Sequence, residues 1–266
     1  MKRFIPFLKK PPLVSVLRLN GMIASGGRGG SLNDAGLAPL IERAFSRGKP
    51  KAVALVINSP GGSPAQSSLI AARIRRLADE KDIKVYAFVE DLAASGGYWL
   101  ASAADEIWVD QNSIVGSIGV ISASFGFHDL IERYGVERRV YTAGKSKAML
   151  DPFRPENPDD VKRLKDLQEQ IHATFIDQVK QGRGDRLDDK TDLFTGDIWV
   201  GQRAVDVGLA DGVGHAAAKL KELFGDKVRF RDYGQKRSIF QRLGAQVMGE
   251  ATSAFEERSL YARFGL

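Results

Sequence analysis

Two short apolar runs constrain this chain most. "KAVALVI" (51–57) and "KVYAFVE" (84–90) are too short to be typical helices, and they do not alternate apolar with polar residues. Such runs are typical of strands that are buried on both faces of a parallel sheet. Each run is followed by a Gly-rich turn, "NSPGGSP" or "DLAASGG", and then by a helical pattern. This order predicts an α/β protein with mostly parallel strands.

The remaining pattern extends this prediction along the chain. Helices are expected over 33–48, with Asn33 or Asp34 as the cap, and over 65–80, roughly 96–104, 128–134 and 159–181, with helical pieces in 201–211 and 217–225. Further strands are expected over 13–23, 106–110 and 137–144. Because ligands of such sheets gather at the carboxyl ends of the strands, the two Gly-rich turns are the first places to look for a site.

Composition excludes several classes of protein. The 266 residues include no cysteine, so a disulfide framework and thiolate chemistry are excluded. The formal charge of +6 is spread among acidic residues, and no nucleic-acid-binding motif accompanies it. No metal-ligand spacing such as H-E-x-x-H occurs, and no run of 18 apolar residues could span a membrane. We therefore expect a cytoplasmic protein without a cofactor, a metal or a nucleic-acid partner.

The two ends differ from the middle. Residues 1–12 form a basic and apolar segment whose "FIPFL" is too short for a signal peptide, and residues 235–266 form an amphipathic helical tail. Between them, 13–234 is expected to be the main domain. The first segment is either a frayed terminus or a weak anchor, and the tail packs either on protein or on a membrane. A peripheral contact with the inner membrane is thus one expectation for these ends.

Ser95, in "ASGG", is the candidate nucleophile. It follows an apolar run and opens a predicted helix, so the amide of Gly96 would lie where an oxyanion forms. Small neighbours would allow a substrate backbone to approach. A serine that merely caps the helix explains the same pattern equally well.

Two other segments could supply the rest of an acyl-transfer site. Gly61 and Gly62 could expose amides for an oxyanion hole, although an ordinary tight turn explains them too. A lysine becomes a general base when burial or nearby cations lower its pKa, and Lys145 and Lys147 lie two residues apart after a predicted strand. Two solvated loop lysines are the simpler explanation. The three histidines, His128, His172 and His215, have no evident carboxylate partner in the sequence.

Taken in order, the motifs resemble a known family. "INSPGG", "AASGGYWLASAADEIWV", "VGSIGV", "GKSKAMLDP" and "GQRAVDVGLAD" together are similar to the signal peptide peptidase A family of serine peptidases, over about 13–224. The resemblance implies an α/β fold of the Clp/crotonase-like type, a spiral of strand-turn-helix units. It also implies a short, single-repeat bacterial form in which the serine and lysine are 147 − 95 = 52 residues apart.

The resemblance assigns roles to particular residues. It implies a Ser–Lys dyad of Ser95 and Lys147, the lysine being the third residue after a glycine. It also implies an oxyanion hole from Gly62 and Gly96, with Gly61 and Gly97 in the supporting loops. The implied reaction is hydrolysis of small apolar peptides, such as remnant signal peptides, or of membrane-associated proteins through an acyl-enzyme. The implied assembly is a ring-like homo-oligomer, in which the dyad forms within one chain or between neighbours.

Two departures and two alternatives accompany this interpretation. The position after the lysine is Ala148 where the family often has an acidic residue, and the N-terminal membrane anchor common in the family is missing. A crotonase-like acyl-CoA enzyme would use the same fold with an acidic residue as its base. A non-catalytic membrane-associated scaffold would keep the fold for assembly alone.

Overall fold

The structure is a computed structural model that describes residues 11–26, 31–234 and 258–266. The chain divides into two compact units. Unit 1 comprises the described residues of 1–118 and 176–266, and unit 2 comprises Gly119–Phe175. Most of the expected N-terminal segment, 1–12, and most of the expected tail, 235–266, lie outside the described residues.

Unit 1 contains eight strands among its described residues. They are β1 (Leu13–Asn20), β2 (Ala52–Ser59), β3 (Lys84–Ala94), β4 (Glu106–Val109), β5 (Ile114–Gly116), β6 (Ile198–Val200), β7 (Gly212–Val213) and β8 (Arg229–Tyr233). Its helices are α1 (Asp34–Ser46), α2 (Pro64–Lys81), α3 (Gly96–Ala101), α6 (Gln202–Asp206) and α7 (Ala216–Phe224), with the short 3₁₀ turn η1 (Gly184–Arg186). Unit 2 contains α4 (His128–Arg133), and α5 (Pro158–Arg183) begins in unit 2 and ends in unit 1.

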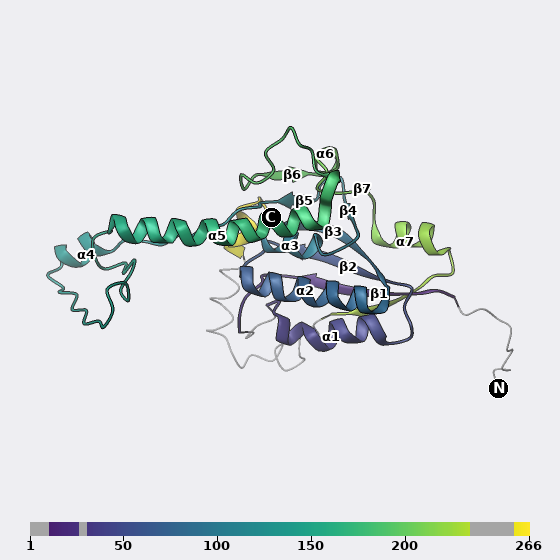
Figure 1. The fold of residues 1–266 in the computed structure, drawn as a ribbon, viewed down its shortest axis with the longest axis horizontal. Coiled ribbons are helices and arrows are strands. Elements are labelled where there is room, and N and C mark those ends of the chain that lie inside the picture. Colours follow the sequence, from purple (N-terminus) through teal and green to yellow (C-terminus); the bar gives the residue numbers. More distant parts are fainter. Residues whose placement is uncertain (1–10, 27–30, 235–257) are drawn as a thin grey trace. The chain divides into compact units, whose positions relative to one another are not determined.

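The strands form one sheet (Figure 1). Its order is β6-β5-β3-β2-β1-β8, with β4 pairing with both β3 and β7. Every pairing is parallel except that of β5 with β6. The prediction of an α/β protein with mostly parallel strands is confirmed.

Both faces of the central strands are covered, which explains their unbroken apolar sequences. On one face, Leu220 of α7 packs against a cluster that includes Val14, Val16 and Val56. The alternate residues of β2, such as Val53 and Leu55, are fully buried on the opposite side, where α1, α2 and α3 pack on one another and on the sheet. Burial on both faces is what a parallel sheet requires.

Side-chain caps fix where two of the helices begin. Asn33 caps α1 by accepting a hydrogen bond from the Gly36 amide at 2.8 Å, as the sequence predicted. Ser63 caps α2 in the same way by accepting from the Gln66 amide, and Pro64 occupies the first helical position.

Three expected elements are wrong or too long. No strand forms over 137–144, where Tyr141 and most of its neighbours are exposed and pair with no other strand. The strand expected over 13–23 ends at Asn20, because Gly21 turns the backbone at φ 101°. The helical stretch expected over 201–211 is limited to α6, because Gly208 adopts φ 79°.

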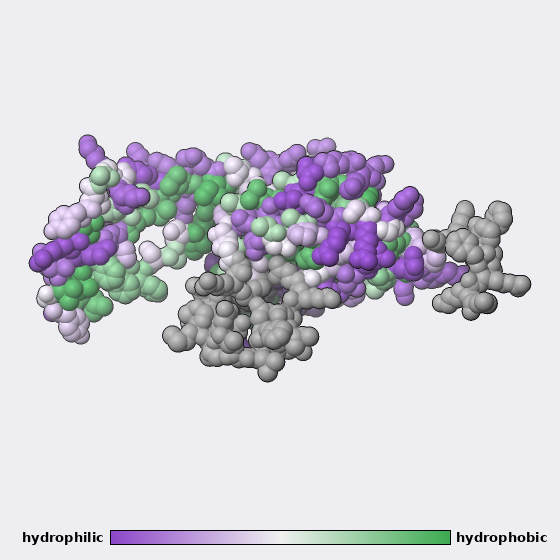
Figure 2. All heavy atoms as spheres, turned by 90° about the horizontal axis from the view of Figure 1, so that it is seen from below, coloured by the Kyte–Doolittle hydropathy of each residue, from purple (hydrophilic) through white to green (hydrophobic). Residues whose placement is uncertain are grey.

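Unit 2 has little core of its own. Its one buried apolar side chain is that of Phe175, the last residue of the unit. The rings of Phe127 and Phe153 stack with their centroids 5.5 Å apart. Figure 2 shows apolar side chains, in green, on the surface of this unit. Unit 2 thus exposes side chains that proteins usually bury.

Within the described ranges, no helix is both long and apolar enough to cross a membrane. Of the expected tail, residues 258–266 are described, and the hydroxyl of Tyr261 donates to the carbonyl oxygen of Asn58, at the end of β2, at 2.9 Å.

Candidate active site

Ser95 lies at the junction of β3 and α3. Ala93 and Ala94 pair with Val115 and Gly116 of β5, and the Ser95 amide donates to the Gly116 carbonyl oxygen at 2.8 Å. The strand therefore runs to the residue before the serine, further than the sequence suggested. Ser95 is half-buried, whereas all six residues of α3 are buried. The serine is the accessible residue of an otherwise enclosed turn.

The backbone of Ser95 is strained. Its φ of 51° and ψ of −122° belong to a region that residues other than glycine rarely adopt. At the start of α6 the same turn recurs, with φ 47° and ψ −119°, and there the residue is Gly201. The turn before α3 therefore carries a serine side chain at a position where glycine would be less strained.

The hydroxyl of Ser95 does not cap α3. No capping hydrogen bond forms, in contrast to Asn33 and Ser63, and the hydroxyl has no hydrogen-bond partner among the described residues. The interpretation of Ser95 as an ordinary helix cap is therefore wrong. Its hydroxyl is unengaged within the part of the chain that the structure describes.

The turn after β2 meets the turn after β3. Gly61 (φ 95°) packs so closely that a Cβ there would lie 2.6 Å from the Gly96 amide nitrogen and 2.9 Å from Ser95 Cβ. Gly97 approaches β2 equally closely, since its Cβ would lie 2.5 Å from the Ser59 carbonyl oxygen. Glycine is required at these positions because two backbones share the space. The structure thus brings Gly61, Gly62, Ser95, Gly96 and Gly97 together.

Two backbone amides in this cluster are unpaired. Ile23 bridges Gly62 by donating to the Gly61 carbonyl oxygen and by accepting from the Ser63 amide, both at 2.8 Å. That pattern leaves the amide of Gly62 facing away from Ile23. Among the described residues, neither this amide nor that of Gly96 donates a hydrogen bond. Two backbone amides that have no hydrogen-bond partner and lie beside a serine hydroxyl can stabilise an oxyanion.

Two serines that sequence reasoning missed brace these turns. The buried Ser67 of α2 donates to the Ser63 carbonyl oxygen at 2.9 Å and leaves no room for a Cβ at Gly96. Ser59 donates to the Gly21 carbonyl oxygen at 2.7 Å and accepts from the Gly61 amide at 3.2 Å. No local motif marks either serine, because the partners come from other loops.

Lys147 belongs to unit 2, whereas Ser95 belongs to unit 1. The neighbours of each residue are therefore described within its own unit. Lys145 and Lys147 are exposed, and neither forms an ion pair with a described residue. Between them, Ser146 accepts a hydrogen bond from the Arg163 guanidinium at 2.6 Å, which ties this turn to α5.

The end of the same segment is also fixed. Asp151 accepts from the Phe153 amide at 3.1 Å and pairs with Arg138 at 3.2 Å. The amide of Phe153, together with Arg138, holds the pKa of the Asp151 carboxyl below its usual range. The lysine turn is therefore anchored on both sides while its two ammonium groups stay in solvent.

The histidines differ from expectation at one position. His215 does have a carboxylate partner, since its Nε2 lies 2.7 Å from Asp110 Oδ2. The hydrogen bond from His215 is the main reason that the pKa of Asp110 falls to about 2. Ser113 is buried: its Oγ accepts from the backbone amide of Asp110, not from the carboxylate, and its hydroxyl donates to backbone carbonyl oxygens. The pair therefore lacks an available serine, and no Ser-His-Asp triad forms here.

Among the residues that the structure describes, one group of side chains could hold a metal ion. His128, Asp129 and Glu132 each place one ligand atom within 4.8 Å of the others. All three lie on the six-residue helix α4, which has no buried residue. Hydrated groups on such a helix do not form a built cation site.

The fold and these turns define an α/β protein with a strained serine beside two free amides. The sequence profile of Peptidase family S49 matches residues 78–227, a range that contains both Ser95 and Lys147. The chain belongs to peptidase family S49, as its resemblance to the signal peptide peptidase A family implied. Family membership supports a peptidase function and favours neither the acyl-CoA enzyme nor the scaffold.

The individual relatives carry different names. A Brucella melitensis protein named "Na(+)/H(+) antiporter NhaA" is 46% identical over 100% of this chain, which spans 39% of that protein's length. The Arabidopsis thaliana "Serine protease SPPA, chloroplastic" is 31% identical over 76% of this chain and 30% of its own length. The solved membrane-bound stomatin-specific protease 1510-N, a mutant in complex with a substrate peptide, matches 93% of this chain and 100% of that chain at 14% identity and a TM-score of 0.50, a likeness of fold.

Proposed function

We propose that the protein is a serine endopeptidase in which Ser95 is the nucleophile and Lys147, of the same or a neighbouring chain, is the general base. The Ser95 hydroxyl gives its proton to the neutral amine of Lys147 while Oγ bonds to the scissile carbonyl carbon. The carbonyl oxygen becomes an oxyanion that accepts from the amides of Gly62 and Gly96. The C–N bond then breaks, and the lysine returns the proton to the leaving amine. Water hydrolyses the resulting ester.

One observation carries this proposal. Ser95 occupies a backbone conformation that glycine occupies at the corresponding turn before α6, and its hydroxyl makes no structural hydrogen bond. Strain at a residue without a structural role is typical of a functional site. The membership of family S49 supports the same chemistry.

We propose small apolar peptides or segments of membrane-associated proteins as the substrates. The amide of Gly62 faces away from its bridge with Ile23, so that an extended peptide could pair with this edge. The chloroplast relative's name, a serine protease, supports the hydrolysis of peptide bonds.

The experiment is an assay of variants on an apolar fluorogenic peptide. Ser95→Ala and Lys147→Ala should abolish hydrolysis, whereas Lys145→Ala, two residues away, is the matched control and should retain it. Activity should rise with pH, because only the neutral amine can accept the serine proton. Full activity in Ser95→Ala or Lys147→Ala would refute the dyad. Binding of a CoA thioester without hydrolysis of peptides would favour the acyl-CoA alternative.

We also propose that the protein assembles with copies of itself through unit 2. Unit 2 has 57 residues and no substantial core. We therefore do not expect it to be stable while its apolar surface is exposed to water. The large apolar side chains that unit 2 exposes are Ile121, Phe125, Phe127, Leu130, Tyr134, Val136, Tyr141, Phe153 and Leu167. An exposed apolar surface of this kind is typical of a subunit interface.

Light scattering during gel filtration tests this assembly. Phe125 is chosen for substitution because its side chain is 80% exposed. Phe125→Asp should lower the mass of the oligomer. Leu223→Asp on α7, at 41% exposure, introduces the same charge on unit 1 and should leave the mass unchanged. A monomeric wild-type protein would refute the proposal.

A peripheral membrane contact is the last part of the proposal. The Brucella relative, whose length far exceeds this chain, is named as an antiporter, which supports a peptidase that works at a membrane surface. The basic segment 1–12 is the candidate contact. Flotation with anionic vesicles should recover the full chain and should fail for a variant that lacks residues 1–12. Equal flotation of both proteins would contradict this role.

A further inference from the structure

The helix that carries the candidate nucleophile cannot hold its own geometry. Helix α3 has only six residues, and a helix of this length is not stable alone in water. The strained residue Ser95 directly precedes the helix, and the free amide of Gly96 belongs to its first residue. Contacts from elsewhere in unit 1 must therefore fix α3, since strained backbone persists only where its surroundings over-determine it.

One of these contacts is made by Tyr98. Its side chain is fully buried, and its hydroxyl donates to the Leu209 carbonyl oxygen at 2.8 Å. Burial raises the pKa of Tyr98, so that the hydroxyl stays protonated and remains a donor. A single bond thus ties the middle of α3 to a segment 111 residues away in the sequence.

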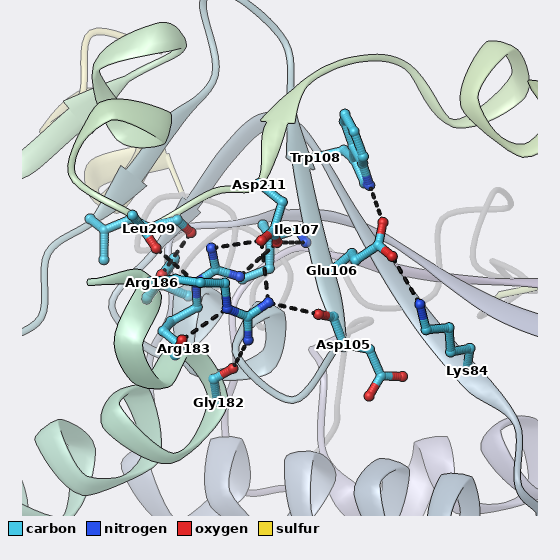
Figure 3. A network of polar contacts seen from close by, with 12 residues as sticks. Lys84, Asp105, Glu106, Ile107, Trp108, Gly182, Arg183, Arg186, Leu209 and Asp211 are labelled. Atoms are coloured by element: carbon cyan, nitrogen blue, oxygen red, sulfur yellow. Dashed lines mark hydrogen bonds and ion pairs between the residues drawn. The ribbon is translucent and has the colours of Figure 1, made fainter. Parts of the chain in front are cut away.

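The segment that accepts this bond is itself held by Arg183, at the end of α5. The Arg183 guanidinium is buried, donates to the Gly208 carbonyl oxygen at 2.8 Å, and pairs with both oxygens of Asp211 at 2.7 and 3.1 Å (Figure 3). Asp211 also accepts from the Ile107 amide at 2.7 Å. Burial raises the pKa of Asp211, but the bonds from Arg183 and Ile107 hold it below its usual range. The carbonyl of Leu209 lies between these two anchored positions.

The other end of α3 is held by the same part of α5. Gln178 donates to Ser102 Oγ at 3.3 Å, and Ser102 donates to the Trp99 carbonyl oxygen at 2.8 Å. Gly182 lies so close to Ser102 that a Cβ there would overlap the Ser102 carbonyl oxygen. Residues 178–183 therefore fix both the middle and the end of α3.

We propose that Tyr98 is a positioning residue for acyl transfer, and that Arg183 acts through it. The Tyr98 hydroxyl holds α3 so that Ser95 Oγ and the Gly96 amide keep their relative placement during the reaction. This inference rests on the proposed peptidase function. It adds that the alignment of the nucleophile depends on a bond remote from the substrate.

Tyr98→Phe tests the proposal because it removes one oxygen atom and leaves the ring. A misplacement of 1 Å costs about 10²-fold in rate, and we expect a smaller shift to lower kcat by about tenfold with KM unchanged. Labelling of Ser95 by a fluorophosphonate should slow in parallel. Tyr233→Phe is the matched control, since Tyr233 is buried in β8 and its hydroxyl has no partner among the described residues. Both variants are compared at a temperature where urea titration shows them folded.

The outcomes separate the two proposals. If the wild type is labelled at Ser95 but Tyr98→Phe matches Tyr233→Phe in kcat and in labelling rate, positioning by Tyr98 is refuted and the peptidase function stands. If the wild type is neither labelled nor active, both fail. Should Tyr98→Phe not fold, Arg183→Lys loosens the segment whose Leu209 carbonyl oxygen accepts the Tyr98 bond, and an unchanged kcat and labelling rate there refute the proposal in the same way.

Discussion

Replacing Ser95, the proposed nucleophile, by glycine should make the protein inactive and yet more stable. Ser95 has φ 51° and ψ −122°, and a residue other than glycine in such a region costs about 1–3 kcal/mol. Glycine loses more conformational entropy on folding, which offsets about 0.5–1 kcal/mol. The hydroxyl makes no hydrogen bond with the described residues, so its removal costs little. We expect Ser95→Gly to raise the free energy of unfolding by about 1 kcal/mol.

The assay is urea unfolding followed by circular dichroism, with Ser95→Ala as the comparison. Alanine removes the same hydroxyl but keeps the Cβ and the strain, so Ser95→Ala should match the wild type in stability. Both variants should lack peptidase activity. If Ser95→Gly were no more stable than Ser95→Ala, the claim that strain is stored at the nucleophile would be refuted.

Three further predictions concern the supports of the site. Gly62→Ala should lower kcat by about a hundredfold, because a Cβ there overlaps the Ile23 carbonyl oxygen and displaces the amide proposed for the oxyanion hole. Gly225→Ala is the control: Gly225 has φ 85° and open space around it, so kcat should not change. Equal kcat values for the two variants would contradict the role of the Gly62 amide. Asp211→Asn should lower the free energy of unfolding in urea by about 3 kcal/mol, since it leaves the charge of Arg183 buried without its partner; a loss typical of a surface residue would argue against this. The hydrogen bond from Arg73 lowers the pKa of Asp34 below its usual 3.8. The Asp34 carboxylate therefore stabilises the fold above pH 3.8, and this contribution is lost as the pH falls below that value. The difference in melting temperature between wild type and Asp34→Asn should therefore shrink in acid, and a difference independent of pH would contradict the assignment.

The sequence was sufficient for elements whose patterns are local. The runs at 51–57 and 84–90 are β2 and β3, because burial on both faces leaves a continuous apolar sequence. The cap of α1 was narrowed to Asn33 or Asp34, because a cap bonds within three residues, and the structure shows that it is Asn33. The strand expected over 137–144 failed because its apolar residues have no neighbouring strand to pair with.

The details of the site depend on contacts between distant segments, which no single motif contains. The close approach of Gly61 to Gly96 and the bond from Tyr98 to Leu209 join parts of the chain that are 35 and 111 residues apart. The partnership of His215 with Asp110 was missed for the same reason. Whether Ser95 caps α3 could not be read from "ASGG", because a cap and a nucleophile use the same residue type and only the backbone angles separate them.

The most direct test of the central claim is to map where a fluorophosphonate reacts. Mass spectrometry of digested wild-type protein should find the probe on Ser95, with labelling retained in Lys145→Ala and lost in Lys147→Ala, because the nucleophile needs its base. Labelling of another serine, or equal labelling of Ser95 when Lys147 is replaced, would contradict the claim that this chain cleaves peptides through a Ser–Lys pair.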